Sequence, residues 1–448
     1  MASSILYDDS IRTSVVDARS CFFPVREASA RAPCMRSKSQ SETDIQISTR
    51  AQYLSDQSLN GTSSKILTRR PLHNRQWSSP KHLTKSNSMT DTSFDNPIMA
   101  TADDALSAKQ ATVQAGYYED PFITAFPEKT GGRPRHHVQP IIKRGTHARV
   151  SVMDRAIASF LELNSRLVTD KSDDPVVQVV VLGAGKDTSF FRYQTGRLGS
   201  TGGKAVRWFE VDHEAVQVEK VALISSLLEV FNTRISKTGN GWRLQAPQST
   251  NTTSDCFMVS HDLREDPHTL FDKLKQNDLD PDTPTLFVME CVQMYLPEDS
   301  GRLLLQAVVK ACPNACLCYY EPALQSDPFG KVMEQNLTNA QVVLPDSCLI
   351  KIGTLQQHLQ RLVAAGFHQA VGCDMWAAYN TVVTEEQRKI ANRCEFLDEV
   401  EEWILIMRHY CVIVACTPAS TIQTYYCQVG KQSPMGFVAG QSETIIAD

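Results

Sequence analysis

The sequence lacks the features that would place it in a membrane, in the secretory pathway or on nucleic acid. No stretch reaches the roughly 18 consecutive apolar residues of a membrane-spanning helix. The first residues, MASSILYDDSIRT, contain two acids and no long apolar core, so they do not form a secretory signal. A formal net charge of −5 is not the basic excess of a nucleic-acid-binding protein. We therefore expect neither a membrane nor a nucleic-acid partner.

A disulfide framework is also missing. The 13 cysteines are an odd number at irregular spacings, which favours reduced thiols and a cytoplasmic protein. Cys312, Cys316 and Cys318 lie close together in the sequence, but their spacing matches no zinc site and no histidine pair is nearby. We predict no metal site, and we expect these thiols to pack a strand against the helix before it.

Two phosphate-binding motifs are incomplete in the most distinctive stretch, VVQVVVLGAGKDTSFFRY at 176–193. Its apolar run ends at Gly183, which is typical of a buried parallel strand followed by a glycine turn and a helix. Thr188 stands where a dinucleotide fingerprint needs its third glycine, and no Gly-Lys-Ser/Thr follows as in a Walker A loop. The turn therefore favours a nucleoside without phosphates, such as S-adenosylmethionine. Taken alone, the Gly-x-Gly pattern is also compatible with a tight turn that binds nothing.

Acidic side chains come at or just after the ends of three further predicted strands. They are Asp212, Asp262 and Glu290, and Tyr295 follows shortly after Glu290. Because ligands bind at the carboxyl edge of parallel sheets, we expect these side chains to lie near the glycine turn. A carboxylate at this edge can accept hydrogen bonds from the two hydroxyl groups of a ribose.

The chain divides into three parts by composition. Residues 1–100 are rich in Ser, Thr, Arg and Asn without a sustained period, so we predict a disordered segment that cannot offset its chain entropy. A folded domain is predicted over 101–417, and 418–448 is predicted to be a mostly irregular tail. Arg144, His147 and Arg149 lie near the start of a predicted helix and form a candidate anion site, with a solvated helix face as the alternative.

Alternating strands and helices predict an α/β fold with a seven-stranded sheet. The predicted strands span 176–182, 205–211, 256–260, 284–289, 311–321, 368–373 and 409–417. One predicted helix begins near Asp103, and the others span 140–167, 214–228, 267–276, 354–366 and 385–403. Residues 233–254 are predicted to form an exposed polar insertion.

With these residues in place, the chain from about Ala105 to Thr417 resembles the leucine carboxyl methyltransferase family. The matching segments are GYYEDP at 116–121, 144–150, LGAGKDTSFFR at 182–192, FEVD at 209–212, DLR at 262–264, ECVQMYL at 290–296, YYEP with DPFG and NL at 319–337, EFLDE at 395–399 and MRHYC at 407–411. The resemblance implies a class I S-adenosylmethionine-dependent methyltransferase with a Rossmann-like sheet and a helical N-terminal lid. It also implies a monomer that methylates the C-terminal leucine carboxylate of the type 2A protein phosphatase catalytic subunit.

The resemblance further implies roles for individual residues. Gly183 would line the cofactor pocket, Asp212 would bind the ribose, Asp262 and Leu263 would hold the adenine, and Glu290 would lie under the methionine part. Lys109 and Arg149 match basic positions at the cofactor carboxylate and the acceptor, and Arg149 and Tyr295 are the residues expected to assist catalysis. The family turn often has an aromatic residue where this chain has Lys186.

The implied chemistry needs no general base. A C-terminal carboxyl group has a pKa of about 3.5 and is ionised at neutral pH, so it is already a nucleophile. The sequence shows no Ser-His-Asp or Cys-His set. Two alternatives stay open: a carboxyl methyltransferase acting on a modified tRNA base, whose relatives carry an additional repeat domain, and a phosphatase-binding protein without turnover.

Overall fold

The computed structural model describes residues 95–127, 138–167, 177–202, 205–245, 254–351 and 353–431, with 433, 435, 437 and 441–447 near the end. The disorder predicted over 1–100 therefore falls outside the description as far as residue 94. The domain limits at 100 and 417 stay predictions. No helix in these ranges is both long and apolar enough to cross a membrane.

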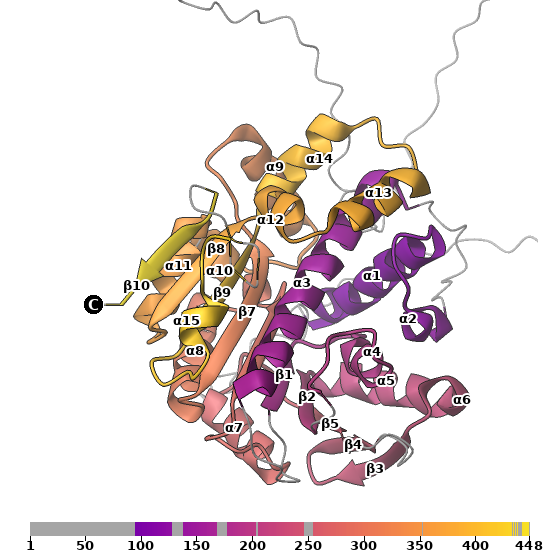
Figure 1. Ribbon diagram of the computed structural model, residues 1–448, viewed down its shortest axis with the longest axis vertical. Coiled ribbons are helices and arrows are strands. Elements are labelled where there is room, and N and C mark those ends of the chain that lie inside the picture. Colours follow the sequence, from indigo (N-terminus) through magenta and orange to yellow (C-terminus); the bar gives the residue numbers. More distant parts are fainter. Residues whose placement is uncertain are drawn as a thin grey trace, which may run out of the picture. The chain divides into compact units, whose positions relative to one another are not determined.

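The described strands form one ten-stranded sheet in the order β10-β8-β9-β7-β6-β1-β2-β5-β4-β3 (Figure 1). The strands are β1 (Val177–Leu182), β2 (Val206–Asp212), β3 (Arg234–Thr238), β4 (Gly241–Gln245), β5 (Asp255–Ser260), β6 (Thr285–Glu290), β7 (Ala315–Pro322), β8 (Gln369–Asp374), β9 (Tyr410–Cys416) and β10 (Glu443–Ile446). The five strands from β7 to β5 are parallel, while β9 runs antiparallel between β7 and β8. The predicted α/β class and its seven strands are confirmed, and β10 and the β3–β4 hairpin extend the sheet at its two ends.

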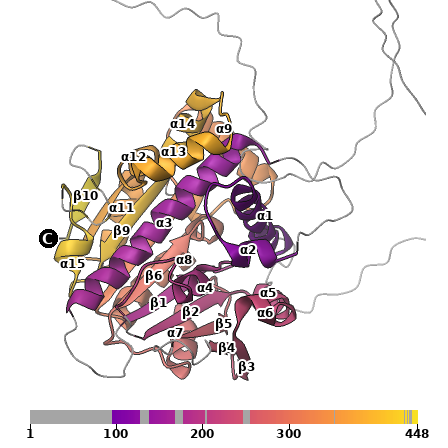
Figure 2. The ribbon, with the colours of Figure 1, turned by 45° about the vertical axis from the view of Figure 1, so that its right-hand side comes forward.

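Helices cover both faces of this sheet (Figures 1 and 2). They are α1 (Asp95–Gln114), α2 (Pro121–Ala125), α3 (Pro140–Leu167), α4 (Ser189–Gln194), α5 (Glu214–Ser226), α6 (Leu228–Phe231), α7 (Pro267–Gln276), α8 (Glu298–Ala311), α9 (Pro328–Asn339), α10 (Cys348–Lys351), α11 (Leu355–Ala364), α12 (Met375–Thr381), α13 (Glu385–Cys394), α14 (Val400–Arg408) and α15 (Gln423–Tyr426). A short 3₁₀ turn, η2 (Gln293–Tyr295), follows β6.

The two faces of the sheet carry separate apolar cores. Successive side chains of a strand point to opposite faces, so Val179 and Val181 join one core whereas Val180 and Leu182 join the other. Helix α3 contributes to the first core, and α7, α8 and α11 contribute to the second. The alternation explains why β1 is apolar almost throughout: both faces of a central parallel strand are buried.

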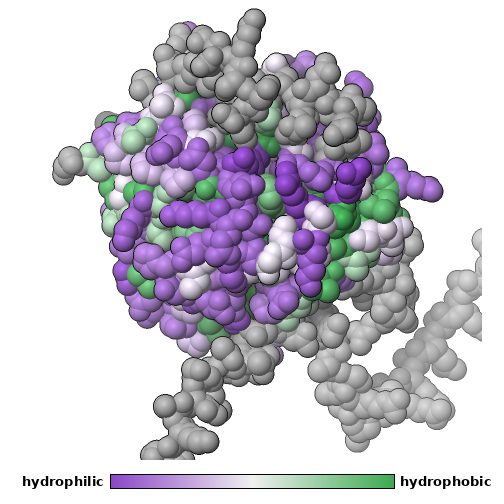
Figure 3. Space-filling view, turned by 90° about the horizontal axis from the view of Figure 1, so that it is seen from below, coloured by the Kyte–Doolittle hydropathy of each residue, from purple (hydrophilic) through white to green (hydrophobic). Residues whose placement is uncertain are grey.

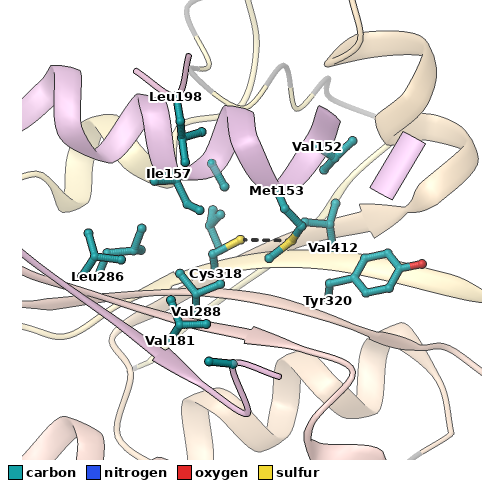
Figure 4. Close-up of a cluster of buried hydrophobic side chains, with 14 of the residues drawn as sticks. Val152, Met153, Ile157, Val181, Leu198, Leu286, Val288, Cys318, Tyr320 and Val412 are labelled. Atoms are coloured by element: carbon teal, nitrogen blue, oxygen red, sulfur yellow. Dashed lines mark hydrogen bonds between the residues drawn. The ribbon is translucent and has the colours of Figure 1, made fainter. Parts of the chain in front are cut away.

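Figure 4 shows the first core from within, with Met153 and Ile157 of α3 lying over Val181 and Val288 of the sheet. Burying an aliphatic side chain of this size contributes about 1.5–3 kcal/mol. The Cys318 thiol lies 3.7 Å from the Met153 sulfur in the same cluster. By contrast, Figure 3 shows an outer face on which hydrophilic residues dominate and hydrophobic ones are scattered.

The three clustered cysteines are structural, as predicted. Cys312 follows the last residue of α8, and Cys316 and Cys318 lie within β7. All three are buried and unbridged. Burial raises the pKa of Cys312 to about 12, because the thiolate would lose its hydration, so this thiol stays protonated and unreactive.

Three predicted boundaries differ from the structure. Helix α1 begins at Asp95 rather than near Asp103, so the disorder predicted over 1–100 is wrong for residues 95–100, which are helical. The strand predicted from Ala311 begins at Ala315, because α8 continues through Ala311. The helix predicted over 385–403 is two helices, α13 and α14, and the Thr384–Gln387 capping box marks the start of the first.

The predicted polar insertion 233–254 instead contains the β3–β4 hairpin, which pairs with β5. Gly241 allows this pairing, because a Cβ there would lie 1.8 Å from the Met258 carbonyl oxygen. Likewise, the predicted irregular tail contains α15 and the edge strand β10, which pairs antiparallel with β8. Backbone pairing to an existing edge organises both segments, although their own sequences are weakly periodic.

Candidate active site

A cavity of about 280 Å³ lies at the carboxyl ends of β1, β2 and β6, with α1 and α3 on its other side. Every residue predicted as a site residue lines it: Lys109, Arg149, Gly183, Asp212, Asp262, Leu263, Glu290 and Tyr295. The structure thus brings these side chains together from elements far apart in the sequence. Their individual roles stay predictions.

The glycine turn after β1 has a backbone that other residues adopt poorly. Gly183 and Gly185 have φ values of +69° and +51°, in the left-handed region that costs an L-residue roughly 1–2 kcal/mol. The Gly183 and Ala184 amides both donate to the Val211 carbonyl oxygen, at 2.8 and 3.1 Å. A Cβ at position 183 would lie 2.7 Å from a Val292 methyl group. Glycine is therefore required at 183 by both conformation and space.

Asp212 is fixed by the backbone of this turn. Its Oδ2 accepts a hydrogen bond from the Gly185 amide at 2.6 Å, and its Oδ1 accepts one from the His213 amide at 2.7 Å. Burial raises the pKa of Asp212, and the two amides partly offset this rise because they favour the charged form. Each carboxylate oxygen has two lone pairs, so one acceptor site per oxygen remains for a ligand.

Asp262 follows β5 and lies beside Leu263 on the cavity wall. Its carboxylate receives hydrogen bonds from Arg264, with Nε at 2.9 Å from Oδ1 and the backbone amide also at 2.9 Å. Burial raises the pKa of Asp262, but these Arg264 contacts outweigh it and hold the pKa below its usual value. This side chain is therefore an ionised, preoriented acceptor.

Two cations and two carboxylates meet at the other strand ends. The Arg149 Nε donates to Glu290, and the Lys109 ammonium lies 3.7 Å from both Glu290 and Asp187. Burial would raise the pKa of Glu290, but Arg149 and Lys109 hold it below its usual value. Burial would also raise the pKa of Asp187, but Lys109 and other nearby cations hold it below its usual value. Both carboxylates are therefore ionised at neutral pH.

Sequence reasoning assigned no role to several charged residues that line this cavity, and Asp187, Asp154 and Arg192 are three of them. Asp187 is an acid two residues after Gly185, so its position in the turn is a signal that could have revealed it. Arg192 of α4 forms a two-point ion pair with Asp154 of α3. Helices distant in the sequence supply this pair, so no motif spacing could have predicted it.

The wall beside Arg149 is aromatic. The Arg149 guanidinium lies 5.1 Å from the centre of the Tyr320 ring, and Tyr320 stacks on Tyr410 with ring centres 5.4 Å apart. Such a cation–π contact contributes about 0.5–1 kcal/mol or more when desolvated. Tyr295 is hydrogen-bonded to Thr101 of α1, and burial raises its pKa, so its hydroxyl stays protonated as a donor. Tyr320, within the YYEP segment, received no site role from the sequence.

The turn that carries Tyr295 is held by a buried carboxylate. Glu321 accepts hydrogen bonds from three successive amides, those of Val292 and Gln293 on Oε1 at 2.7 and 2.8 Å and that of Met294 on Oε2 at 3.2 Å. The preceding Cys291 has φ +55°, which is strained for a residue with a side chain. Burial raises the pKa of Glu321 to about 7, although the three amides favour its charged form.

The candidate anion site at the start of α3 is wrong as a single site. Arg144 points away from the cavity, donating to the Ala391 carbonyl oxygen at 2.9 Å and to Asn392. His147 is 1% exposed and packs against the rings of Tyr117 and Tyr379. Only Arg149 of the predicted trio lines the cavity. Residues at these spacings point to different sides of a helix, with 3.6 residues per turn.

His147 provides a pH test of this placement. Burial, with a contribution from Arg144, lowers its pKa to about 4, below the unfolded value of about 6.5. The neutral imidazole thus stabilises the fold fully above pH 6.5, and this contribution is lost as pH falls towards 4. We expect His147→Leu to make the free energy of unfolding less steep with pH, by up to about 1.4 kcal/mol per unit between pH 6 and 4.5.

Urea unfolding at several pH values measures this slope in the wild type and the variant. Other buried groups titrate in the same range in both proteins, so the difference between the two curves isolates His147. His268→Leu, at an exposed histidine on α7, is the matched control and should leave the slope unchanged. Parallel curves for His147→Leu and the wild type would show that His147 is not a buried neutral group.

No group of three or more His, Cys, Asp and Glu side chains suited to a metal ion occurs in the described part of the chain.

Comparison with known proteins identifies the family of this chain. The model of the family described as leucine carboxyl methyltransferase matches residues 97–309. Among solved structures, a DUF574 family protein from Streptomyces avermitilis is 13% identical with a TM-score of 0.40, covering 62% of this chain and 86% of that chain.

Curated relatives match over most of the chain. Leucine carboxyl methyltransferase 1 of Caenorhabditis elegans is 30% identical over 331 residues, covering 74% of this chain and 93% of the relative. The protein of the same name from Aspergillus fumigatus is 30% identical, covering 71% and 82%. The one from Rattus norvegicus is 28% identical, covering 71% and 89%. The chain therefore belongs to the leucine carboxyl methyltransferase family and is a methyltransferase.

Proposed function

We propose that this protein transfers a methyl group from S-adenosylmethionine to the C-terminal leucine carboxylate of a type 2A protein phosphatase catalytic subunit. Family membership supports the reaction class. The observation that carries the proposal is a single cavity lined by a glycine turn, the oriented Asp212 carboxylate and the cations Lys109 and Arg149. Such a set can bind a nucleoside, an amino acid carboxylate and an anionic acceptor together.

The residues at the glycine turn fit the proposed cofactor. Gly183 lines the cavity without a side chain, so a ligand can approach its main chain closely. The free lone pairs of Asp212 suit two ribose hydroxyls, and Asp262 and Leu263 offer an acceptor and an apolar surface to an adenine. S-adenosylmethionine would supply the activated methyl group.

The charged cluster fits the two ends of the reaction. Glu290 would attract the positively charged methionine part of the cofactor, while Lys109 would bind the methionine carboxylate. Arg149 and the Tyr295 hydroxyl would bind one oxygen of the acceptor carboxylate, leaving its other oxygen to face the methyl group. The near-attack distance for such a displacement is roughly 3–3.5 Å.

The proposed reaction requires the protein to bind and orient the cofactor and the acceptor carboxylate. It does not require the protein to remove a proton. The carbon–sulfur bond breaks as the carbon–oxygen bond forms, the sulfonium becomes a thioether and the carboxylate becomes an ester. Cation and anion neutralise each other in the transition state, so fixed charges that hold both are more useful than a base. The neutral, buried His147 fits this reasoning, because it lies off the cavity wall.

Transfer of a tritiated methyl group to purified phosphatase catalytic subunit tests the function. We expect labelling of the intact subunit that is released by mild base, as an ester requires. A subunit lacking its last leucine should show no labelling. Equal labelling of both subunits would contradict the C-terminal acceptor, and labelling of transfer RNA alone would replace the proposal with the tRNA alternative.

A further inference from the structure

Lys186 occupies an unusual place for a lysine, inside the glycine turn between Gly185 and Asp187. Its side chain is 3% exposed. The ammonium lies 2.9 Å from the Asp103 carboxylate of α1 and 3.1 Å from the Glu219 carboxylate of α5. A buried charge needs such partners, since losing one leaves its desolvation uncompensated. Through these two ion pairs, Lys186 connects the glycine turn to helix α1 and to helix α5.

Helix α1 forms one wall of the cavity and lies beside the glycine turn. Thr101, Ala102 and Lys109 of this helix line the cavity together with Gly183 and Gly185. Ala102 packs on the turn so closely that its Cβ would lie 3.5 Å from a Cβ at Gly185. A nucleoside bound in the turn would therefore lie against α1.

Separating α1 from the turn would break the Lys186–Asp103 ion pair. Asp103 is 27% exposed and can recover hydration when the two elements part. Lys186 is almost fully buried and would keep only Glu219 as its anionic partner. The energetic cost of opening thus falls mainly on Lys186.

We propose that Lys186 is a positioning residue that latches α1 over the nucleoside end of the cavity and thereby sets how fast S-adenosylhomocysteine leaves. The inference rests on the proposed function, because S-adenosylhomocysteine is the product that the proposed cofactor leaves in the cavity. Lys186 does not contact the reacting atoms in this scheme. Its loss should therefore change binding kinetics more than the methyl transfer step.

Stopped-flow displacement of S-adenosylhomocysteine from the full-length protein tests the latch. We expect Lys186→Met to raise the dissociation rate constant about fivefold or more, while single-turnover methyl transfer at saturating S-adenosylmethionine changes less than twofold. Lys186→Arg should restore slow release, since arginine can still pair with Asp103 and Glu219. Lys389→Met, which removes an exposed ion pair with Glu385 on α13, is the control and should release at the wild-type rate.

Asp103→Asn provides a second route if Lys186→Met folds poorly. It too should speed release, and the double variant Lys186→Met/Asp103→Asn should release no faster than the quicker single variant, because the Lys186–Asp103 ion pair is broken in both single variants. Unchanged release in Asp103→Asn, or additive effects in the double variant, would overturn the latch. A wild type that binds no S-adenosylhomocysteine would refute the proposed cofactor instead, so the two failures are distinguishable.

Discussion

Arg149→Lys is expected to lower the rate of methyl transfer about 10²-fold or more, a loss of about 2.7 kcal/mol in transition-state stabilisation. In the structure the Arg149 Nε already pairs with Glu290, and the guanidinium lies over the Tyr320 ring. A planar guanidinium can keep that pair and still present further N–H groups to an acceptor carboxylate. A single ammonium cannot reproduce this geometry, even though it keeps the charge.

Single-turnover methylation at saturating S-adenosylmethionine measures this effect. Arg155→Lys, at an exposed position of the same helix, is the matched control and should keep the wild-type rate. Calorimetric binding of S-adenosylmethionine separates the acceptor role from a cofactor role. A rate loss of less than about threefold would show that charge alone is sufficient at position 149, and Arg149 would then not orient the acceptor by its shape.

Asp212→Ala is expected to weaken S-adenosylmethionine binding about tenfold or more. A hydrogen bond to a charged group contributes about 1.5–3 kcal/mol, and Asp212 is the carboxylate that the Gly185 and His213 amides hold in one orientation. The alanine variant also removes the acceptor of both amides, so the turn itself loses two contacts. Both effects act in the same direction on cofactor affinity.

Titration calorimetry with S-adenosylmethionine checks the affinity, and circular dichroism checks that the variant is folded. Asp212→Asn separates the two effects, because an amide oxygen can still accept one backbone hydrogen bond without the negative charge. The neighbouring exposed Glu214→Ala controls for a general loss of negative charge on this edge. Wild-type affinity in Asp212→Ala would remove this residue from the cofactor site.

Much of the fold could be read from local patterns. The bounds of α3 and α7 coincide with the predicted 140–167 and 267–276, because each begins at proline and has a regular apolar face. Strand β1 differs by one residue from its prediction, since a buried run that ends in glycine has few alternative structures. The acids at the strand ends could be predicted to line one cavity, because parallel strands end at one edge of the sheet.

Interactions between distant segments could not be predicted from local sequence patterns. The β3–β4 hairpin pairs with β5, and the edge strand β10 pairs with β8. A short polar sequence does not reveal which strand it will pair with. Whether Arg144 and Arg149 serve one site depends on where α12 and α13 pack against α3. That packing directs Arg144 to Ala391 and leaves Arg149 in the cavity.

The sequence by itself determined the α/β class, the glycine turn and the set of residues at the strand ends, because burial on both faces and turn geometry are local requirements. The tertiary structure alone decided how those residues are charged and paired. Glu290 lies between Arg149 and Lys109, Glu321 holds the turn after β6, and Lys186 joins α1 to α5. Electrostatic pairing depends on distance in space and on burial, and neither follows from spacing along the chain.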